Sequence, residues 1–251
     1  MCYRDYQKRG LINHMKRLAI HQTYFFPYIG YFTVLNKADI FIHADSLQYE
    51  ERSWINRNRI IGETLEPKYI TVPLRKNTRE AAINERLINY DKEWEKEILN
   101  QFGYYKKRAP YYKEVMDMLG ELFSQKYQDM SKLAIRSTEL VLERLNIKKE
   151  IHLLSEIDIG PTENLRTDDW GIAVCKAFNG VDTYINAPGG KSFYDPDKYI
   201  EAGLGIEFIQ NRLRPYDQKN NEFIPALSIL DVMMFNSSED IKEMLDDYYV
   251  L

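Results

Sequence analysis

The stretch from Leu18 to Ile60 constrains the fold more than any other part of the chain. It contains two apolar runs with strand character, residues 17–20 and 39–45, separated by an aromatic loop and a short segment with helical character. A strand, a helix and a second strand over this length favour a parallel βαβ unit with a right-handed crossover. We therefore expect the rest of an α/β domain to be organised around this stretch.

The rest of the chain divides into a helical middle and a second α/β block. Residues 84–148 place apolar side chains at three- and four-residue spacing, which predicts a helical insert. From residue 151 onward, strand-like and helix-like segments alternate again, and we expect both blocks to share one sheet. Residues 57–74 fit either a hairpin or a further parallel strand. The predicted fold class is α/β, with a mostly parallel sheet flanked by helices, as in nucleotide-binding folds.

Composition narrows the class of protein. The 251 residues are 44% hydrophobic and 29% charged, typical of a soluble globule, and the net charge of -4 argues against non-specific binding to nucleic acid or acidic membranes. We expect residues 15–251 to form a single domain and residues 1–14 a weakly ordered extension. The two cysteines, Cys2 and Cys175, lie far apart, which fits a reducing cytoplasm. No apolar run approaches the roughly 20 residues of a membrane span. Four histidines without HxH or HExxH spacing argue against a dedicated zinc site.

Polar side chains follow the first two predicted strands. His21 and Gln22 come after the first strand, and Asp45 and Gln48 after the second. Because ligands of open α/β sheets bind outside the carboxyl ends of the strands, these groups form the predicted floor of an active site. His21 or Asp45 would take a proton from an attacking group. The alternative for His21 is a buried histidine that serves only packing.

The aromatic loop supplies Tyr24 and Tyr28, whose rings could stack on a planar or sugar ligand. The same position holds a TxGH or HxGH element in class I nucleotidyltransferases. Here Tyr28 and Tyr31 stand where the two histidines of that element would be needed. This difference weakens the analogy without removing it.

The segment SWINRNRI, residues 53–60, is the second candidate for ligand contact. Arg57 and Arg59 would share one face of a strand, with Asn56 and Asn58 on the other face and Trp54 just before them. Arginine presents a planar fork of donors suited to phosphate or carboxylate. The alternative is a solvated edge strand with structural asparagines.

The segment NAPGGKSFYD, residues 186–195, follows another predicted strand. Gly189 and Gly190 would let backbone amides approach a ligand, and Lys191 would bring a positive charge to phosphate. The GxxxxGK[ST] spacing of a P-loop is absent. The alternative is an ordinary turn.

These segments together resemble the WbqC-like protein family. HQTYFFPYIGYF, ADIFIHAD and SWINRNRI carry the resemblance, and TVPL, TYINAPGGKSFYD and EFIPALSILD extend it over roughly residues 15–235. Thr23 stands where family members more usually have proline. The resemblance implies work on a nucleotide-activated amino sugar in the synthesis of O-antigen or other surface polysaccharide. Within that context, transfer of an aminoacyl group such as glycyl to the sugar amine is the expected step.

Three hypotheses follow. The first is an acyl or aminoacyl transferase acting on a nucleotide sugar, and the second is a non-catalytic protein that binds the same sugar. The third is a nucleotidyltransferase relative that forms an adenylate. ATP and magnesium would be required if the acid is activated on the enzyme, but not if it arrives as a thioester or on an aminoacyl-tRNA. The identities of the sugar and the donor stay open, and a homo-oligomer is compatible with the sequence.

Overall fold

A six-stranded sheet with the order β5-β2-β1-β6-β7-β8 runs through the protein. The computed structural model describes residues 15–251, so the extension expected over residues 1–14 lies outside the described residues. The strands are β1 (Lys16–Gln22), β2 (Ile40–Ala44), β3 (Arg57–Ile61), β4 (Pro67–Thr71), β5 (Glu150–Leu153), β6 (Val181–Asn186), β7 (Gly205–Asn211) and β8 (Tyr248–Val250).

Strand β1 lies at the centre and pairs in parallel with β2 on one side and β6 on the other. Strands β5 and β7 extend the sheet in parallel, and only β8 is antiparallel. The prediction of a mostly parallel sheet shared by both α/β blocks is confirmed. The chain moves outward from β1 to β2 and β5, then returns to β6 on the far side of β1. This reversal of strand order creates a crevice at the carboxyl ends of β1 and β6.

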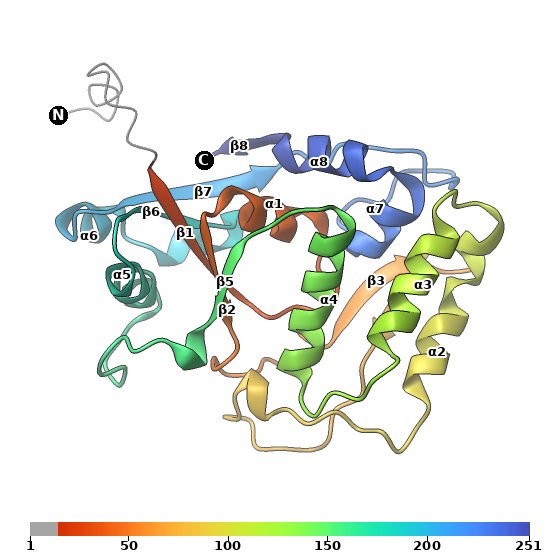
Figure 1. Cartoon of the computed structure of the whole chain (residues 1–251), viewed down its shortest axis with the longest axis horizontal. Helices are drawn as coiled ribbons and strands as arrows, with labels where there is room; N and C mark the ends of the chain where they lie inside the picture. Colours follow the sequence, from red (N-terminus) through yellow and green to blue (C-terminus); the bar gives the residue numbers. More distant parts are fainter. Residues whose placement is uncertain (1–14) are drawn as a thin grey trace.

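Helices cover both faces of the sheet. Helix α1 and helix α8 pack on one face, with α5 and α6 on the other (Figure 1). The helices are α1 (Ile29–Lys37), α2 (Trp94–Asn100), α3 (Tyr112–Leu122), α4 (Met130–Arg144), α5 (Thr167–Ala177), α6 (Pro196–Glu201), α7 (Ile229–Phe235) and α8 (Ser238–Asp246). Short 3-10 helices are η3 (Ile83–Glu85), η4 (Gln101–Lys107), η5 (Leu154–Glu156) and η6 (Pro188–Phe193). Along β1, Leu18 and Ala19 point to opposite cores, as the pleat requires.

The chain between β2 and β5 holds a hairpin and three α-helices. Strands β3 and β4 pair antiparallel, which decides between the two alternatives for residues 57–74 in favour of a hairpin. Helices α2, α3 and α4 lie together on the right of Figure 1, and they fall within the predicted insert. Their buried side chains belong to the same core as α1, and Ser137 of α4 accepts a hydrogen bond from the backbone of Phe26 at 3.2 Å.

A buried carboxylate joins this region to the end of the chain. Asp231 of α7 is fully buried and accepts hydrogen bonds from the Tyr105 hydroxyl at 2.6 Å, the Tyr216 hydroxyl and Gln218 Nε2 at 2.8 Å. The Tyr105 oxygen in turn accepts from the Ile61 backbone N at 2.8 Å. Burial raises the pKa of Asp231, and the three donors oppose that effect.

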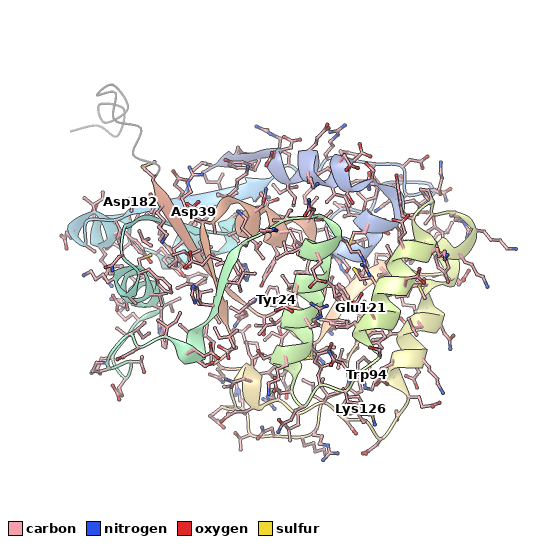
Figure 2. All side chains as sticks on the ribbon, viewed as in Figure 1. Tyr24, Asp39, Trp94, Glu121, Lys126 and Asp182 are labelled. Carbon is pink, nitrogen blue, oxygen red and sulfur yellow. The ribbon has the colours of Figure 1, made fainter. Side chains whose placement is uncertain are left out.

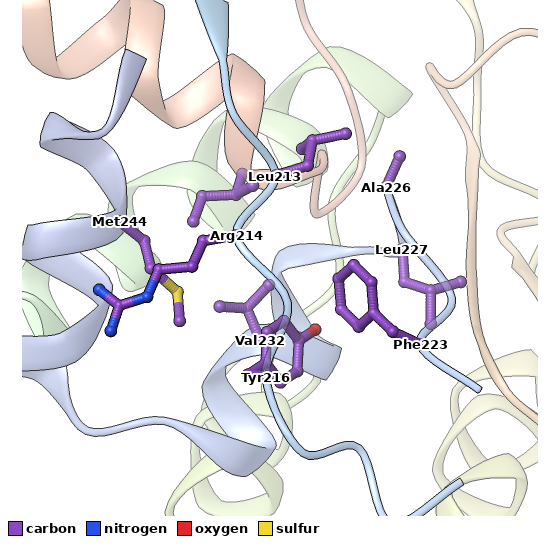
Figure 3. A pocket seen from close by; sticks show the side chains of 9 residues that line it. Leu213, Arg214, Tyr216, Phe223, Ala226, Leu227, Val232 and Met244 are labelled. Atoms are coloured by element: carbon purple, nitrogen blue, oxygen red, sulfur yellow. The ribbon is translucent and has the colours of Figure 1, made fainter. Parts of the chain in front are cut away.

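The segment between β7 and α7 is packed rather than open. Leu213, Tyr216 and Phe223 gather with Val232 and Met244 around a cavity of about 20 Å³ (Figure 3). A space of that size holds about one water molecule, so this part of the fold offers no room for a substrate.

Replacement of Tyr105 by phenylalanine tests the buried network. Tyr105→Phe should lower the free energy of unfolding by about 1–3 kcal/mol, because it leaves the Asp231 carboxylate and the Ile61 N–H short of a partner. Tyr112→Phe is the matched control, since the Tyr112 hydroxyl makes no hydrogen bond within residues 15–251, and it should stay within about 0.5 kcal/mol of wild type. Urea denaturation measures both. Equal losses of unfolding free energy in Tyr105→Phe and Tyr112→Phe would contradict a stabilising role for the Tyr105 hydrogen bonds.

Candidate functional site

A cavity of about 380 Å³ opens where the strand order reverses, at the carboxyl ends of β1 and β6. Three strands, the aromatic loop, the N-terminal part of α5 and the segment after η6 contribute side chains. The lining consists of Ile20, His21, Gln22, Tyr24, Ala44, Leu47, Leu165, Thr167, Trp170, Tyr184, Asn186 and Tyr194. None of these side chains is an acid, a lysine or an arginine. The cavity is therefore a neutral site of aromatic rings, amides and hydroxyls.

His21 is the titratable group at the cavity floor. Its ring lies between those of Tyr24 and Tyr31, at centroid distances of 5.2 Å and 4.6 Å. Nδ1 is enclosed and has no hydrogen-bond partner among residues 15–251. Burial lowers the pKa of His21 to about 4, against the opposing effect of a backbone hydrogen bond at Gln22. The imidazole is consequently neutral at pH 7 and has a lone pair to accept a proton.

His43 of β2 lies beside His21 as its cross-strand partner and is fully buried. The Tyr31 hydroxyl donates to the Gln22 backbone oxygen at 3.3 Å and lies 3.4 Å from His43 Nδ1. The Tyr31 hydroxyl thus lies between the Gln22 carbonyl and the His43 ring. Burial, with a smaller effect of His21, lowers the pKa of His43 to about 3.

Gln22 and Tyr24 face the cavity together with His21. The Tyr24 hydroxyl donates to Gln22 Oε1 at 3.1 Å, which leaves Gln22 Nε2 as a donor for a ligand. Burial raises the pKa of Tyr24 to about 12, so the phenol is neutral at pH 7. Figure 2 labels Tyr24 near the middle of the protein, next to helix α4 in this view. Three of the predicted site residues thus meet at one cavity.

The opposite wall comes from residues that the sequence analysis did not name individually, although Asn186 and Tyr194 lie in the candidate segment 186–195. Thr167 and Trp170 lie in the first turns of α5, and Tyr194 follows η6. Asn186, at the end of β6, donates to the Tyr184 hydroxyl at 3.2 Å and accepts from the Ala187 backbone at 2.7 Å. Its place at the end of a strand beside β1 and at the start of the segment 186–195 could have identified it.

Asp45 and Gln48 do not line the cavity. The Asp45 carboxylate is buried and accepts from the Ser155 backbone N at 3.0 Å, from the Ser155 hydroxyl at 2.7 Å and from Asn84 Nδ2 at 3.3 Å. It therefore ties the end of β2 to η5 and η3. Gln48 is exposed and donates to the Arg79 backbone oxygen at 3.1 Å.

The predicted arginines lie on the outer face of the hairpin. Arg57 stacks over the Tyr69 ring at 4.5 Å, Arg59 lies 5.4 Å from the Trp54 ring, and the two rings stack at 6.3 Å. Trp54 and Tyr69 are 37% and 44% exposed, so this aromatic face is accessible. A hydrogen bond of 3.2 Å from the Phe25 backbone N to the Trp54 oxygen joins it to the aromatic loop.

The two asparagines of this segment have structural contacts. Asn56 accepts from the Tyr49 hydroxyl at 3.0 Å and donates to the Val72 oxygen at 2.9 Å. Asn58 is buried, and its Nδ2 donates to the backbone oxygens of Phe25 at 3.2 Å and Phe26 at 2.8 Å. The contacts of Asn56 and Asn58 therefore agree with the alternative interpretation, in which both asparagines are structural.

Tyr28 and the glycine turn flank the cavity region without lining it. Tyr28 is the N-cap residue of α1, and its ring covers Gly30 so closely that a Cβ there would overlap it. A Cβ at Gly190 would come within 3.0 Å of Asn186 Nδ2, whereas Gly189 has open space around it. Gly190 thus permits the turn to close on the end of β6. Lys191 is exposed and forms no ion pair within residues 15–251.

The model of the WbqC-like protein family matches residues 22–243. The chain belongs to this family. A Mycobacterium tuberculosis relative, Uncharacterized protein Rv1507c, is 28% identical over 237 residues, which cover 92% of this chain and 98% of the relative. No solved structure matches the chain.

Two features are absent from residues 15–251 of this WbqC-like chain. Residues 15–251 contain no group of three or more His, Cys, Asp or Glu side chains placed to hold a metal ion. Within the same residues, no helix combines the length and apolar character needed to cross a membrane.

The buried histidines predict how stability depends on pH. The pKa of His43 is below its unfolded value, so below about pH 6.5 the unfolded chain binds a proton that the folded chain excludes. The free energy of unfolding should therefore fall between pH 6.5 and pH 4, with His43 contributing about 1.4 kcal/mol per pH unit once the unfolded histidine is protonated.

Urea denaturation of His43→Leu at several pH values measures this contribution. The variant should lose stability less steeply than wild type across that range. Carboxylates titrate there too, so the quantity to compare is the difference between slopes. His152→Leu is the control, because His152 lies on edge strand β5 with a side chain 39% exposed. Identical slopes for wild type and His43→Leu would be inconsistent with a neutral buried His43.

Proposed function

We propose that this chain is an enzyme of surface polysaccharide (O-antigen) biosynthesis that acts in the cytoplasm. It transfers an acyl or aminoacyl group, glycyl being the first candidate, to the amino group of a nucleotide-linked amino sugar. The observation that carries the proposal is the neutral cavity at the reversal of strand order, with His21 at its floor. Such crevices are where open α/β sheets bind their ligands.

The lining supports a sugar ring as the enclosed part of the substrate. Trp170, Tyr24 and Tyr194 offer ring faces and edges to a sugar, and Gln22 Nε2 and the Thr167 hydroxyl offer hydrogen bonds to its substituents. An ionised phosphate would find no opposite charge in this lining. The diphosphate would therefore lie outside the cavity, and we assign to it Lys191, an exposed cation of η6.

His21 is the group that we assign to proton transfer. As the sugar amine forms its bond to the acyl carbon, His21 takes the amine proton, and the leaving group departs from the acyl carbon with its electron pair. Asp45 fits this role less well, because both of its oxygens already accept hydrogen bonds from Ser155 or Asn84. ATP and magnesium belong to the reaction only if the acid is activated on this chain. A thioester or an aminoacyl-tRNA would supply an activated group directly.

A second candidate function is binding of the nucleotide sugar without catalysis. The lowered pKa of His21, about 4, favours it, because so weak a base gains little driving force for removing a proton. Both candidate functions use the same cavity, and a measurement of turnover distinguishes the enzyme from the binding protein.

Thermal shift with UDP- and dTDP-sugars, and with ATP in the presence and absence of magnesium, tests the ligand class. A ligand at 100 times its dissociation constant should stabilise the fold by about 2.7 kcal/mol, which raises Tm by a few degrees. Trp170→Ala should remove the response. Tyr249→Ala, an exposed aromatic on β8, should keep it. A response to ATP alone would favour an adenylate-forming relative instead.

Turnover of His21→Gln tests the proposed proton transfer. With a sugar that shifts wild type and an activated acyl donor, the variant should bind the sugar but lose about 10²–10⁴-fold in kcat. His152→Gln is the matched control and should keep wild-type kcat. Absence of turnover in wild type with thioester, aminoacyl-tRNA and ATP-dependent donors would leave the binding function as the better account.

A further inference from the structure

Three loops that meet at strand β3 contain residues in a left-handed backbone conformation. Non-glycine residues adopt positive φ only at an energetic cost, and they persist there when the surrounding structure holds them. The three residues next to β3 are Phe26 (φ 41°), Arg52 (φ 60°) and Ala226 (φ 54°).

Three consecutive side chains of the hairpin hold these three residues by their carbonyl oxygens. Asn58 Nδ2 donates to the Phe26 oxygen at 2.8 Å, and the Ser228 hydroxyl donates to the same oxygen at 2.8 Å. The buried Asn58 also accepts from the Arg59 backbone N at 2.9 Å, which fixes the orientation of its amide.

The two arginines hold the other two loops. Arg57 donates through Nη2 to the Arg52 oxygen and through Nε to the Ser53 oxygen at 3.3 Å. Arg59 Nη2 donates to the Ala226 oxygen at 3.5 Å. The Arg57 guanidinium is thus engaged with two backbone carbonyls and that of Arg59 with one, whereas the buried Arg59 Nε has no hydrogen-bond partner among residues 15–251.

Two of the held loops carry residues that line the cavity, and the third packs against one of these two loops. The loop after β2 carries Leu47, and the aromatic loop carries Tyr24, both of which line the cavity. The third segment ends at Ser228, whose backbone N donates to the Arg59 oxygen at 2.9 Å and which pairs with Tyr28. Figure 3 shows Ala226 on this segment, beside Leu227.

We propose that Arg57, Asn58 and Arg59 form a clamp that positions the cavity wall. In this account the two arginines act through the loops and do not contact the ligand. The part that concerns the ligand rests on the proposed function, whereas the clamp itself can be tested without any ligand. The competing account is direct phosphate contact by Arg57 and Arg59 on the aromatic hairpin face.

Glycine at a strained position distinguishes the two accounts. Arg57→Met removes the donors, so amide hydrogen exchange over residues 49–55 should rise about five- to thirty-fold, the factor expected for loss of one or two kcal/mol. Arg52→Gly in the same chain should bring exchange back toward wild type, because glycine adopts positive φ without steric cost. The double-mutant cycle with Arg52→Gly alone isolates this coupling.

Arg59→Met with Ala226→Gly repeats the test on the third segment, with exchange followed over residues 224–228. Lys68→Met is the matched control, because Lys68 is an exposed cation on the partner strand β4 and should leave exchange in both regions unchanged. Unchanged exchange in Arg57→Met and Arg59→Met, or increased exchange that glycine does not reverse, would overturn the clamp.

Affinity for UDP-N-acetylglucosamine, or for the nucleotide sugar that shifts wild type, tests the positioning role. Arg52→Gly in the Arg57→Met chain, and Ala226→Gly in the Arg59→Met chain, should restore affinity for the nucleotide sugar together with slow amide exchange. Restored exchange with affinity still lost would show direct contact by the arginine and overturn the positioning role. If wild type binds no nucleotide sugar, the proposed function fails while the exchange cycle still decides the clamp.

Discussion

The parallel pairing of β1 with both β2 and β6 is the constraint on which the rest of the structure depends. A parallel neighbour cannot be reached by a tight turn, so each pairing requires a long crossover that places helices on the faces of the sheet. The connection from β1 to β2 runs through α1 on one face of the sheet, and the connection from β6 to β7 runs through α6 on the other face, so the two diverge and leave a crevice at the carboxyl ends of β1 and β6. The cavity is a consequence of strand order, and His21, Gln22 and Asn186 face it because each ends or nearly ends a strand.

The polar groups behind the cavity show how burial selects neutral chemistry. His21 and His43 are adjacent on neighbouring strands, and two imidazolium ions there would be buried side by side without a carboxylate among the residues that line the cavity. The neutral form of both imidazole rings therefore has the lower energy. The Tyr31 hydroxyl links His43 to the Gln22 backbone. The acid of this region, Asp45, is instead saturated by Ser155 and Asn84, so it fixes geometry.

Sequence periodicity was sufficient to predict the sheet class and the helical insert, because apolar spacing directly reports which faces are buried. It was also sufficient to place His21 and Gln22 at a strand end and Tyr24 in the loop that follows. Trp170 and Tyr194 were missed, because their positions depend on how the segments around α5 and η6 cross the sheet edge, which periodicity does not encode. Nor could strand-face alternation reveal that Asn58 reaches back to the carbonyl of Phe26, a contact across 32 residues.

The hairpin explains why a wall built from distant segments can have one conformation. Each left-handed non-glycine residue costs about 1–3 kcal/mol, against a total stability of about 5–15 kcal/mol for a typical domain. Three such residues around one strand would cost a large share of that stability. Each loop would relax to a conformation of lower energy if nothing held it. Side chains from both faces of β3 hold the three left-handed residues together. Strand β3 is itself anchored by its pairing with β4 and by the hydrogen bond from the Ile61 amide to the Tyr105 hydroxyl. Relaxation of one loop is thereby coupled to the others, so the shape of the cavity depends on a hairpin that lies outside it.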